Sequence, residues 1–142
     1  MPLSLNEIRK RATEFSKEWE LVTDERAEAQ SFWNDFFNVF GVSRKRVATF
    51  EKPVKKADGH QGYIDLLWKR VVLVEHKSRG KDLTSALAQA KDYFPGLKDE
   101  ELPRYIIVSN FYTPSTEATL HMSVPQEVSQ CYYAYGLCSY FL

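Results

Sequence analysis

The sequence predicts an α/β fold, in which a small mixed β-sheet is flanked by helices and an extra helix precedes them. Two stretches with helical spacing of apolar residues come first. Three short strand-like runs follow, and a further helix and strand come after them. This order is typical of helices packed against a sheet. At 142 residues the chain is long enough for one domain with a substantial core.

Two helices are expected in the first 40 residues. The pattern Ser4–Glu7 is a capping box, and apolar residues at helical spacing then predict a helix over 5–20. Thr23 or Asp24 caps a second helix over 24–40, which Gly41 ends. Six aromatic or apolar residues on the second helix make it the main core helix.

The middle of the chain alternates strand and turn signals. A short strand over 47–51 is expected to close at Pro53, and a polar loop to follow over 55–62. Two strongly apolar runs then predict adjacent strands. The remaining expected elements are strands at 62–68 and 71–77, a helix at 83–94 that Pro95-Gly96 ends, and a strand at 105–111.

The last part of the chain differs in composition from the rest. Residues 111–142 contain no Lys or Arg, and they hold both cysteines and five of the eight tyrosines. We therefore divide the chain into a domain over 1–111 and an atypical tail over 112–142, to which the sequence assigns no structure. The two cysteines lack the partners of a zinc site or a disulfide framework, so a cytoplasmic chain is expected.

Charge is distributed unevenly although the chain has no net charge. Residues 44–81 hold 11 Lys or Arg and four acids, a local charge of +7. No run approaches the roughly 20 apolar residues of a membrane helix. A basic surface around an acidic pair is typical of a phosphate-binding site, although a solvated basic face would also explain it.

Three residues carry the strongest functional signal. Asp65 and Glu75 each lie in an apolar run, where an ionised carboxylate is costly unless it is paired or binds a metal. Lys77 follows Glu75 by two residues and therefore shares its face of the strand. Two carboxylates and a lysine predict a site where Mg²⁺, held by Asp65 and Glu75, assists phosphodiester hydrolysis. A strand-end lysine that merely pairs with Glu75 is the plain alternative for Lys77.

Asp65 joins the other two only if the connection between the strands has the right parity. A two-residue turn would place Asp65 on the opposite face from Glu75. We therefore predict a three- or five-residue loop or a bulge. With a three-residue loop over 68–70, Asp65 lies opposite Leu73 and diagonal to Glu75.

Supporting residues are expected on the helices. Gln89 and Tyr93 lie one turn apart and could hold a DNA phosphate or Lys77, although an ordinary exposed pair is the commoner case. Glu28 is a candidate for a further carboxylate, with Glu25 as its rival and an N-terminal acid favoured by the helix dipole as the alternative. His60 and His76 have no ligand spacing, so both are interpreted as non-catalytic. The expected DNA-binding cations are Lys55, Lys56, Arg79 and Lys81.

Several of these motifs together resemble a known family. Asp65 followed by Glu75-His76-Lys77 resembles the PD-(D/E)XK nuclease signature, and Gln89–Tyr93 is similar to the Q-x-x-x-Y motif of its RecB-like branch. The segments 29–37, 62–68 and 75–83 resemble the N-terminal nuclease domain of MmeI-like restriction–modification enzymes. The resemblance implies a restriction-endonuclease-like fold and Mg²⁺-dependent cleavage. In full-length relatives a methyltransferase that uses S-adenosylmethionine follows, and this chain holds no such domain.

We therefore expect a type II-like deoxyribonuclease domain that cuts double-stranded DNA. Expected partners are DNA, a transient second copy on DNA, and a methyltransferase that this chain lacks. One alternative is a catalytically silent DNA-binding module or a truncated fragment of an adenine DNA methyltransferase. Another is a structural or interaction domain without a DNA role, which predicts no salt-dependent DNA binding.

Overall fold

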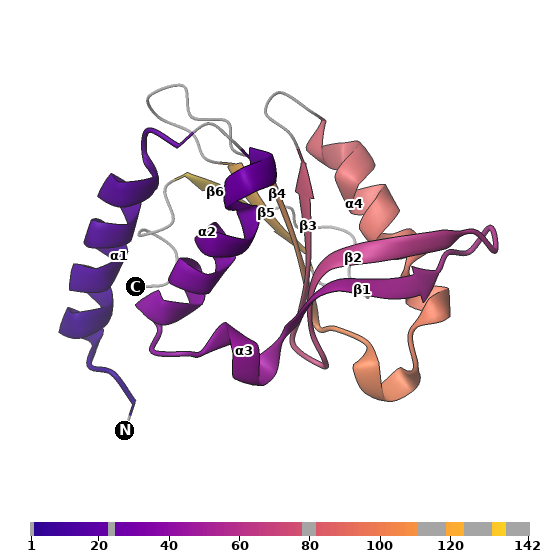
Figure 1. Cartoon of the computed structure of the whole chain (residues 1–142), viewed down its shortest axis with the longest axis horizontal. Coiled ribbons are helices and arrows are strands. Elements are labelled where there is room, and N and C mark those ends of the chain that lie inside the picture. Colours follow the sequence, from indigo (N-terminus) through magenta and orange to yellow (C-terminus); the bar gives the residue numbers. More distant parts are fainter. Residues whose placement is uncertain (1, 23–24, 78–81, 111–118, 124–131, 136–142) are drawn as a thin grey trace.

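In the computed structural model, a mixed sheet forms the middle of three layers, with helices on either side (Figure 1). The structure describes residues 2–22, 25–77, 82–110, 119–123 and 132–135. Within these described ranges, six strands lie in the order β1-β2-β3-β4-β5-β6, and β3 with β4 is the one parallel pair. This architecture confirms the predicted α/β sandwich. The strands are β1 (Thr49–Lys55), β2 (Gln61–Trp68), β3 (Val72–Lys77), β4 (Tyr105–Asn110), β5 (Thr119–Ser123) and β6 (Tyr132–Tyr135).

Helices cover both faces of the sheet. The helices α1 (Leu5–Trp19) and α2 (Glu25–Val39) lie on one side, and α4 (Leu83–Asp92) lies on the other and connects β3 to β4 (Figure 1). A parallel pair requires a long crossover connection, and α4 supplies it. Short helical turns complete the set: α3 (Arg44–Val47), η1 (Phe94–Gly96) and η2 (Asp99–Glu101). Within the described residues, no helix combines the length and apolar character needed to cross a membrane.

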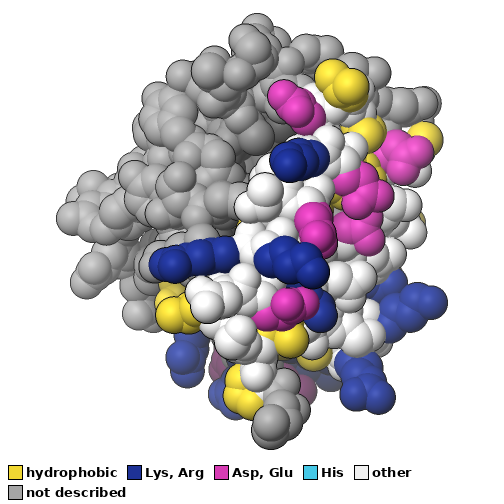
Figure 2. Space-filling view, turned by 90° about the vertical axis from the view of Figure 1, so that its left-hand side faces the viewer, with side chains coloured by type: hydrophobic (Ala, Val, Ile, Leu, Met, Phe, Trp, Pro, Cys, Tyr) yellow, Lys and Arg dark blue, Asp and Glu magenta, His cyan; other side chains and the backbone are white. Residues whose placement is uncertain are grey.

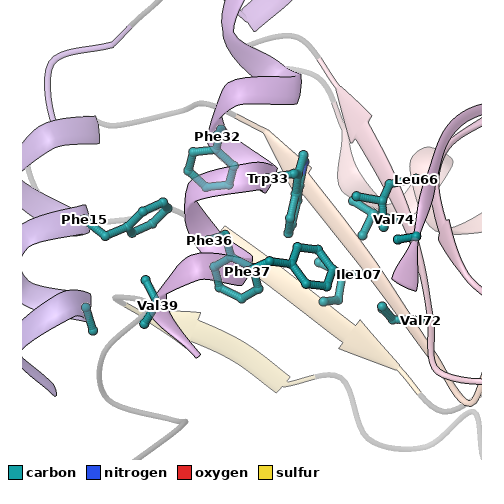
Figure 3. Packing of buried hydrophobic residues seen from close by; sticks show 12 residues of the cluster. Phe15, Phe32, Trp33, Phe36, Phe37, Val39, Leu66, Val72, Val74 and Ile107 are labelled. Carbon is teal, nitrogen blue, oxygen red and sulfur yellow. The ribbon is translucent and has the colours of Figure 1, made fainter. Parts of the chain in front are cut away.

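The larger core lies between α2 and the sheet. Aromatic side chains of α2 project towards Leu66 and Val74, and Phe15 of α1 packs on them from behind (Figure 3). Trp33 is almost completely buried and meets Phe36 edge-on, with ring centroids 5.3 Å apart. Full burial of one such side chain stabilises the fold by about 1.5–3 kcal/mol. The face of the molecule on the α1 side carries both acidic and basic side chains, with a few hydrophobic ones among them (Figure 2).

A second core lies between the sheet and α4. Its buried residues include Ile64 and Leu73 from the strands and Ala86 and Ala90 from the helix. The small alanine side chains let α4 approach the sheet closely. Because Glu75 and Lys77 lie on this same face of β3, α4 also forms a wall of the site described below.

One expectation about the elements is wrong, and one short helix was not predicted. The first strand does not close at Pro53 but continues to Lys55. Because β1 is an edge strand, a residue without an N–H donor is tolerated within it. The helix α3 was not expected either; at four residues it is too short to show a period. The tail, to which the sequence assigned no structure, contributes β5 and β6. The division of the chain near residue 111 stays a prediction.

The hairpin of β1 and β2 rotates about its long axis part-way along, so residues two or four apart in sequence point to opposite sides of the sheet. Phe50 and Leu66 face the α2 side, whereas Val54 and Ile64 face the α4 side. Residues two apart in a regular strand share a face, so both strands must rotate between these positions. Glu51 lies at the rotation, outside the regular pairing, with a φ of 51°. Asp65 occupies the matching position in β2, so the bend determines where its carboxylate points.

Candidate active site

The connection between β2 and β3 has the predicted odd length. Trp68 pairs with Val72, which leaves a three-residue loop over 69–71. The loop starts one residue later than expected, so the register runs towards Asp65 opposite Glu75 instead of opposite Leu73. The expected diagonal placement was therefore wrong. Both arrangements keep the two carboxylates on one face, as the parity argument requires.

Asp65 is fixed where the two strands separate. Regular pairing between β2 and β3 ends at Leu66 and Val74. Beyond this point the carboxylate of Asp65 accepts the backbone N–H of His76 at 2.5 Å, as a carbonyl of the neighbouring strand otherwise would. The bend in the β1–β2 hairpin and this hydrogen bond together hold the Asp65 side chain beside Glu75.

Glu75 is buried with little compensation for its charge. Its exposed fraction is 2%, and Oε1 accepts a hydrogen bond from Lys77 Nζ at 3.0 Å. Oε2 has no hydrogen-bond partner among the residues that the structure describes. Burial raises the pKa of Glu75 to about 7, and the nearby charge of Asp65 adds to the rise while Lys77 opposes it. The negative charge of ionised Glu75 is therefore only partly compensated by the described residues.

Lys77 is hydrogen-bonded to side chains of both β3 and α4. Its Nζ donates to Glu75 Oε1 at 3.0 Å and to Gln89 Oε1 at 2.6 Å. Gln89 in turn donates from Nε2 to Tyr93 Oη at 2.7 Å. The predicted pairing of Gln89 with Tyr93 and its contact with Lys77 are thus present. A chain of hydrogen bonds runs from Tyr93 at the end of α4 to Glu75 in β3.

Tyr93 is a core residue and not an exposed helix residue. Its exposed fraction is 1%, and it belongs to the buried hydrophobic cluster that includes Ile64 and Leu97. Burial raises the pKa of Tyr93 to about 12, and the charges of Glu75 and Asp65 contribute, so the hydroxyl stays protonated at neutral pH. It can hold a hydrogen bond but cannot act as a base there.

His76 points away from the site. It faces α2, where its ring lies 6.4 Å from the rings of Phe32 and of Trp33. Burial lowers the pKa of His76 to about 4, and the charge of Lys77 lowers it further, so the imidazole is neutral at physiological pH. This placement agrees with its interpretation as a non-catalytic residue.

The remaining candidates are placed less closely. Among the described residues, no group of three His, Cys, Asp or Glu side chains is arranged to hold a metal ion, so Glu28 is not joined to Asp65 and Glu75. Glu28 is half-buried on α2, and its role stays a prediction. The expected cations Arg79 and Lys81 fall outside the described residues.

Two features of the site were not expected from the sequence. Lys56, expected as one of four DNA-binding cations with no link to the catalytic residues, has its Nζ 5.9 Å from the centroid of the Tyr93 ring. Gly62 leaves the space that this contact needs, because a Cβ there would lie 2.8 Å from both Lys56 Cε and Tyr93 Cε1. A glycine at the start of a strand was the available signal, but it does not identify which side chains occupy the space.

A comparison with protein families identifies the relatives of this chain. Residues 10–121 match the family described as MmeI, N-terminal domain. The chain belongs to this family. The match covers Asp65, Glu75, Lys77, Gln89 and Tyr93, and it confirms the resemblance seen in the sequence. Searches of curated proteins and of solved structures found no match. The MmeI N-terminal domain family associates the chain with restriction enzymes, and the chemistry must be argued from the site.

Proposed function

We propose that this member of the MmeI N-terminal domain family is a Mg²⁺-dependent deoxyribonuclease domain of the PD-(D/E)XK type that hydrolyses phosphodiester bonds in double-stranded DNA. The observation that carries the proposal is the buried pair of carboxylates, Asp65 and Glu75, with Lys77 on the same face. A merely structural pair of this kind would be fully compensated by cations or donors. Glu75 keeps one oxygen without a partner among the described residues.

The donor set fits a hard divalent cation. Mg²⁺ binds oxygen ligands, commonly one or two carboxylates with waters and substrate phosphate oxygens completing the shell. Asp65 and Glu75 would supply the two carboxylates, and the buried Oε2 of Glu75 has no hydrogen-bond partner among the described residues. When bound, the ion would polarise the phosphate and lower the pKa of a coordinated water.

The protein's own residues supply orientation and charge. Lys77 has three donors, two of which are used by Glu75 and Gln89. The third can orient the attacking water, and the ammonium charge offsets negative charge that develops on the phosphate. Gln89 and Tyr93 fix the direction of the Lys77 side chain from α4. Water attacks phosphorus, one ester P–O bond breaks, and the departing oxygen gains a proton.

Cleavage of supercoiled plasmid by the purified chain tests this function. We expect nicked or linear product in Mg²⁺ and none in EDTA. Asp65→Ala and Lys77→Ala should lose cleavage while their circular dichroism spectra stay unchanged. Glu100→Ala removes an exposed acid and serves as the matched control.

Other outcomes would contradict the proposal in different ways. Cleavage that survives both Asp65→Ala and Lys77→Ala would place the chemistry elsewhere. Salt-dependent DNA binding without cleavage would favour the silent binding module. Absence of both would favour a structural or interaction domain.

A further inference from the structure

Lys55 and Lys56 are neighbours in sequence but lie in different surroundings. Lys55 is exposed at the end of β1, where it pairs with Gln61. Lys56 is half-buried and reaches the other face of the hairpin, where Gly62 and Tyr93 lie. Simple attraction of DNA to a basic surface would not distinguish the two lysines.

The backbone around Lys56 is fixed on two sides. Its N–H donates to His60 O at 2.9 Å, which closes the turn between β1 and β2. The next residue, Ala57, donates its N–H to Asp92 O at 3.1 Å, which ties the turn to the end of α4. Lys56 therefore starts from a fixed position directly beside Tyr93.

The Lys56 side chain then runs over Gly62 to Tyr93, the residue at the end of the hydrogen-bond chain from Glu75. Its stem crosses Gly62, where the missing Cβ leaves room, and its ammonium lies near the Tyr93 ring at a distance compatible with a cation–π contact. Tyr93 is also the residue that receives the hydrogen bond from Gln89, at the start of the chain to Lys77. The positive charge of Lys56 opposes the rise that burial causes in the pKa of Glu75.

Lys56 and Lys77 differ in the contacts that their ammonium groups make within the protein. Lys77 is held by two hydrogen bonds to Glu75 and Gln89. No ion pair of Lys56 is present among the described residues, and its ammonium lies 5.9 Å from the centroid of the Tyr93 ring. A second cation beside an acidic pair would draw a phosphate towards carboxylates that would otherwise repel it.

We propose that Lys56 contacts a backbone phosphate of the bound DNA next to the Asp65–Glu75 pair, and so acts as a second cation of the active site, distinct from the general basic surface that includes Lys55. The inference rests on the proposed nuclease function. It assigns Gly62 and Tyr93 the task of positioning the Lys56 stem and ammonium.

Substitutions at Lys56 can separate charge from packing. Lys56→Met keeps an unbranched stem over Gly62 and Tyr93 but removes the charge, and Lys56→Arg keeps the charge. Lys55→Met removes the same charge from the adjacent exposed position. The readouts are the cleavage rate at saturating DNA in Mg²⁺ and the affinity for a short duplex in EDTA across a salt series.

We expect Lys56→Met to lower the rate at saturating DNA about tenfold or more and to reduce the slope of log affinity against log salt by about one. Lys56→Arg should restore most of both. Lys55→Met should weaken affinity without lowering the rate at saturating DNA. If the chain binds DNA but does not cut it, the nuclease function fails, and a loss of affinity in Lys56→Met that exceeds the loss in Lys55→Met still supports the phosphate contact.

Equal behaviour of Lys56→Met and Lys55→Met in both assays would overturn the inference. So would full activity of Lys56→Met, which would reduce Lys56 to a packing residue. A wild-type chain that neither binds nor cuts DNA would overturn it together with the proposed function.

Discussion

Glu75 and Glu101 are both buried, yet their surroundings are opposite. Their exposed fractions are 2% and 6%. Lys52 and Lys69 both reach Oε1 of Glu101, at 2.7 and 3.0 Å, and the backbone N–H of Lys98 donates to Oε2. The hydrogen bond from Lys52 holds the pKa of Glu101 down at about 2. At Glu75 burial dominates, and its pKa rises to about 7.

The difference distinguishes a carboxylate whose charge is compensated within the protein from the one that we propose to be functional. Glu101 joins β1, the loop between β2 and β3, and η2, since Arg70 also donates its N–H to Glu101 O at 3.4 Å. Its charge is compensated within the protein. The charge of Glu75 is compensated only in part, and another carboxylate lies nearby. Such a site costs stability in the empty protein and suits a bound cation.

The largest expected effect is on cleavage by Glu75→Gln. An amide cannot replace the carboxylate as an anionic ligand, so the rate should fall by about 1,000-fold or more. The melting temperature should stay equal or rise, because a poorly compensated buried charge is removed. Initial rates and thermal melts at pH 8 measure both. An inactive variant that also melts well below wild type would mean that Glu75 is chiefly structural.

Glu101→Gln should show the reverse pattern. Loss of the carboxylate leaves Lys52 partly buried without its anion, so the free energy of unfolding should fall by about 2 kcal/mol. Urea unfolding measures this, and Glu100→Gln on the same helical turn is the control. The folded variant should retain most of its cleavage rate. An unchanged free energy of unfolding would show that the ion pairs of Glu101 with Lys52 and Lys69 do not stabilise the fold.

Gln89→Ala tests how far the site depends on the hydrogen bonds that run through α4. The variant removes the acceptor of Lys77 and the donor to Tyr93, so Lys77 should be oriented less well. We expect about a tenfold loss of rate at saturating DNA, with little change in affinity. Lys91→Ala on the same helix is the control. A rate equal to wild type would show that Glu75 alone orients Lys77.

The pH dependence of stability should carry the signature of Glu101. Because its pKa is lowered in the folded protein, the stabilisation is complete above the ordinary value of 4.5 and is lost as the pH falls towards 2. The stability advantage of wild type over Glu101→Gln should therefore shrink by about 1 kcal/mol by pH 3.5. Parallel unfolding series at pH 7 and 3.5 measure this. A constant difference would contradict the lowered pKa.

The sequence predicts the relative placement of the candidate site residues better than it predicts their surroundings. Alternation along two strands was enough to require an odd connection between Asp65 and Glu75, and the loop over 69–71 has that length. Helical spacing was enough to join Gln89 to Tyr93. These are short-range geometric rules, so they need no knowledge of distant contacts.

Other features depend on contacts between distant segments. Glu101 lies in an acidic turn that looks solvent-exposed in sequence, and only folding brings Lys52 to it. The positive φ of Glu51 has no signal in its residue type, since such a backbone usually favours glycine or asparagine. The contact of Lys56 with Tyr93 likewise requires the hairpin to turn over onto α4.

Mn²⁺ binding by isothermal calorimetry tests the contrast between the two glutamates most directly, because it requires neither DNA nor turnover. Mn²⁺ accepts the same oxygen ligands as Mg²⁺ and serves as its probe. Wild type and Glu101→Gln should each bind Mn²⁺ at the site, and Glu75→Gln should lose that binding while it remains folded. Equal binding by Glu75→Gln and wild type, or loss of binding only in Glu101→Gln, would contradict the assignment of Glu75 as the functional carboxylate.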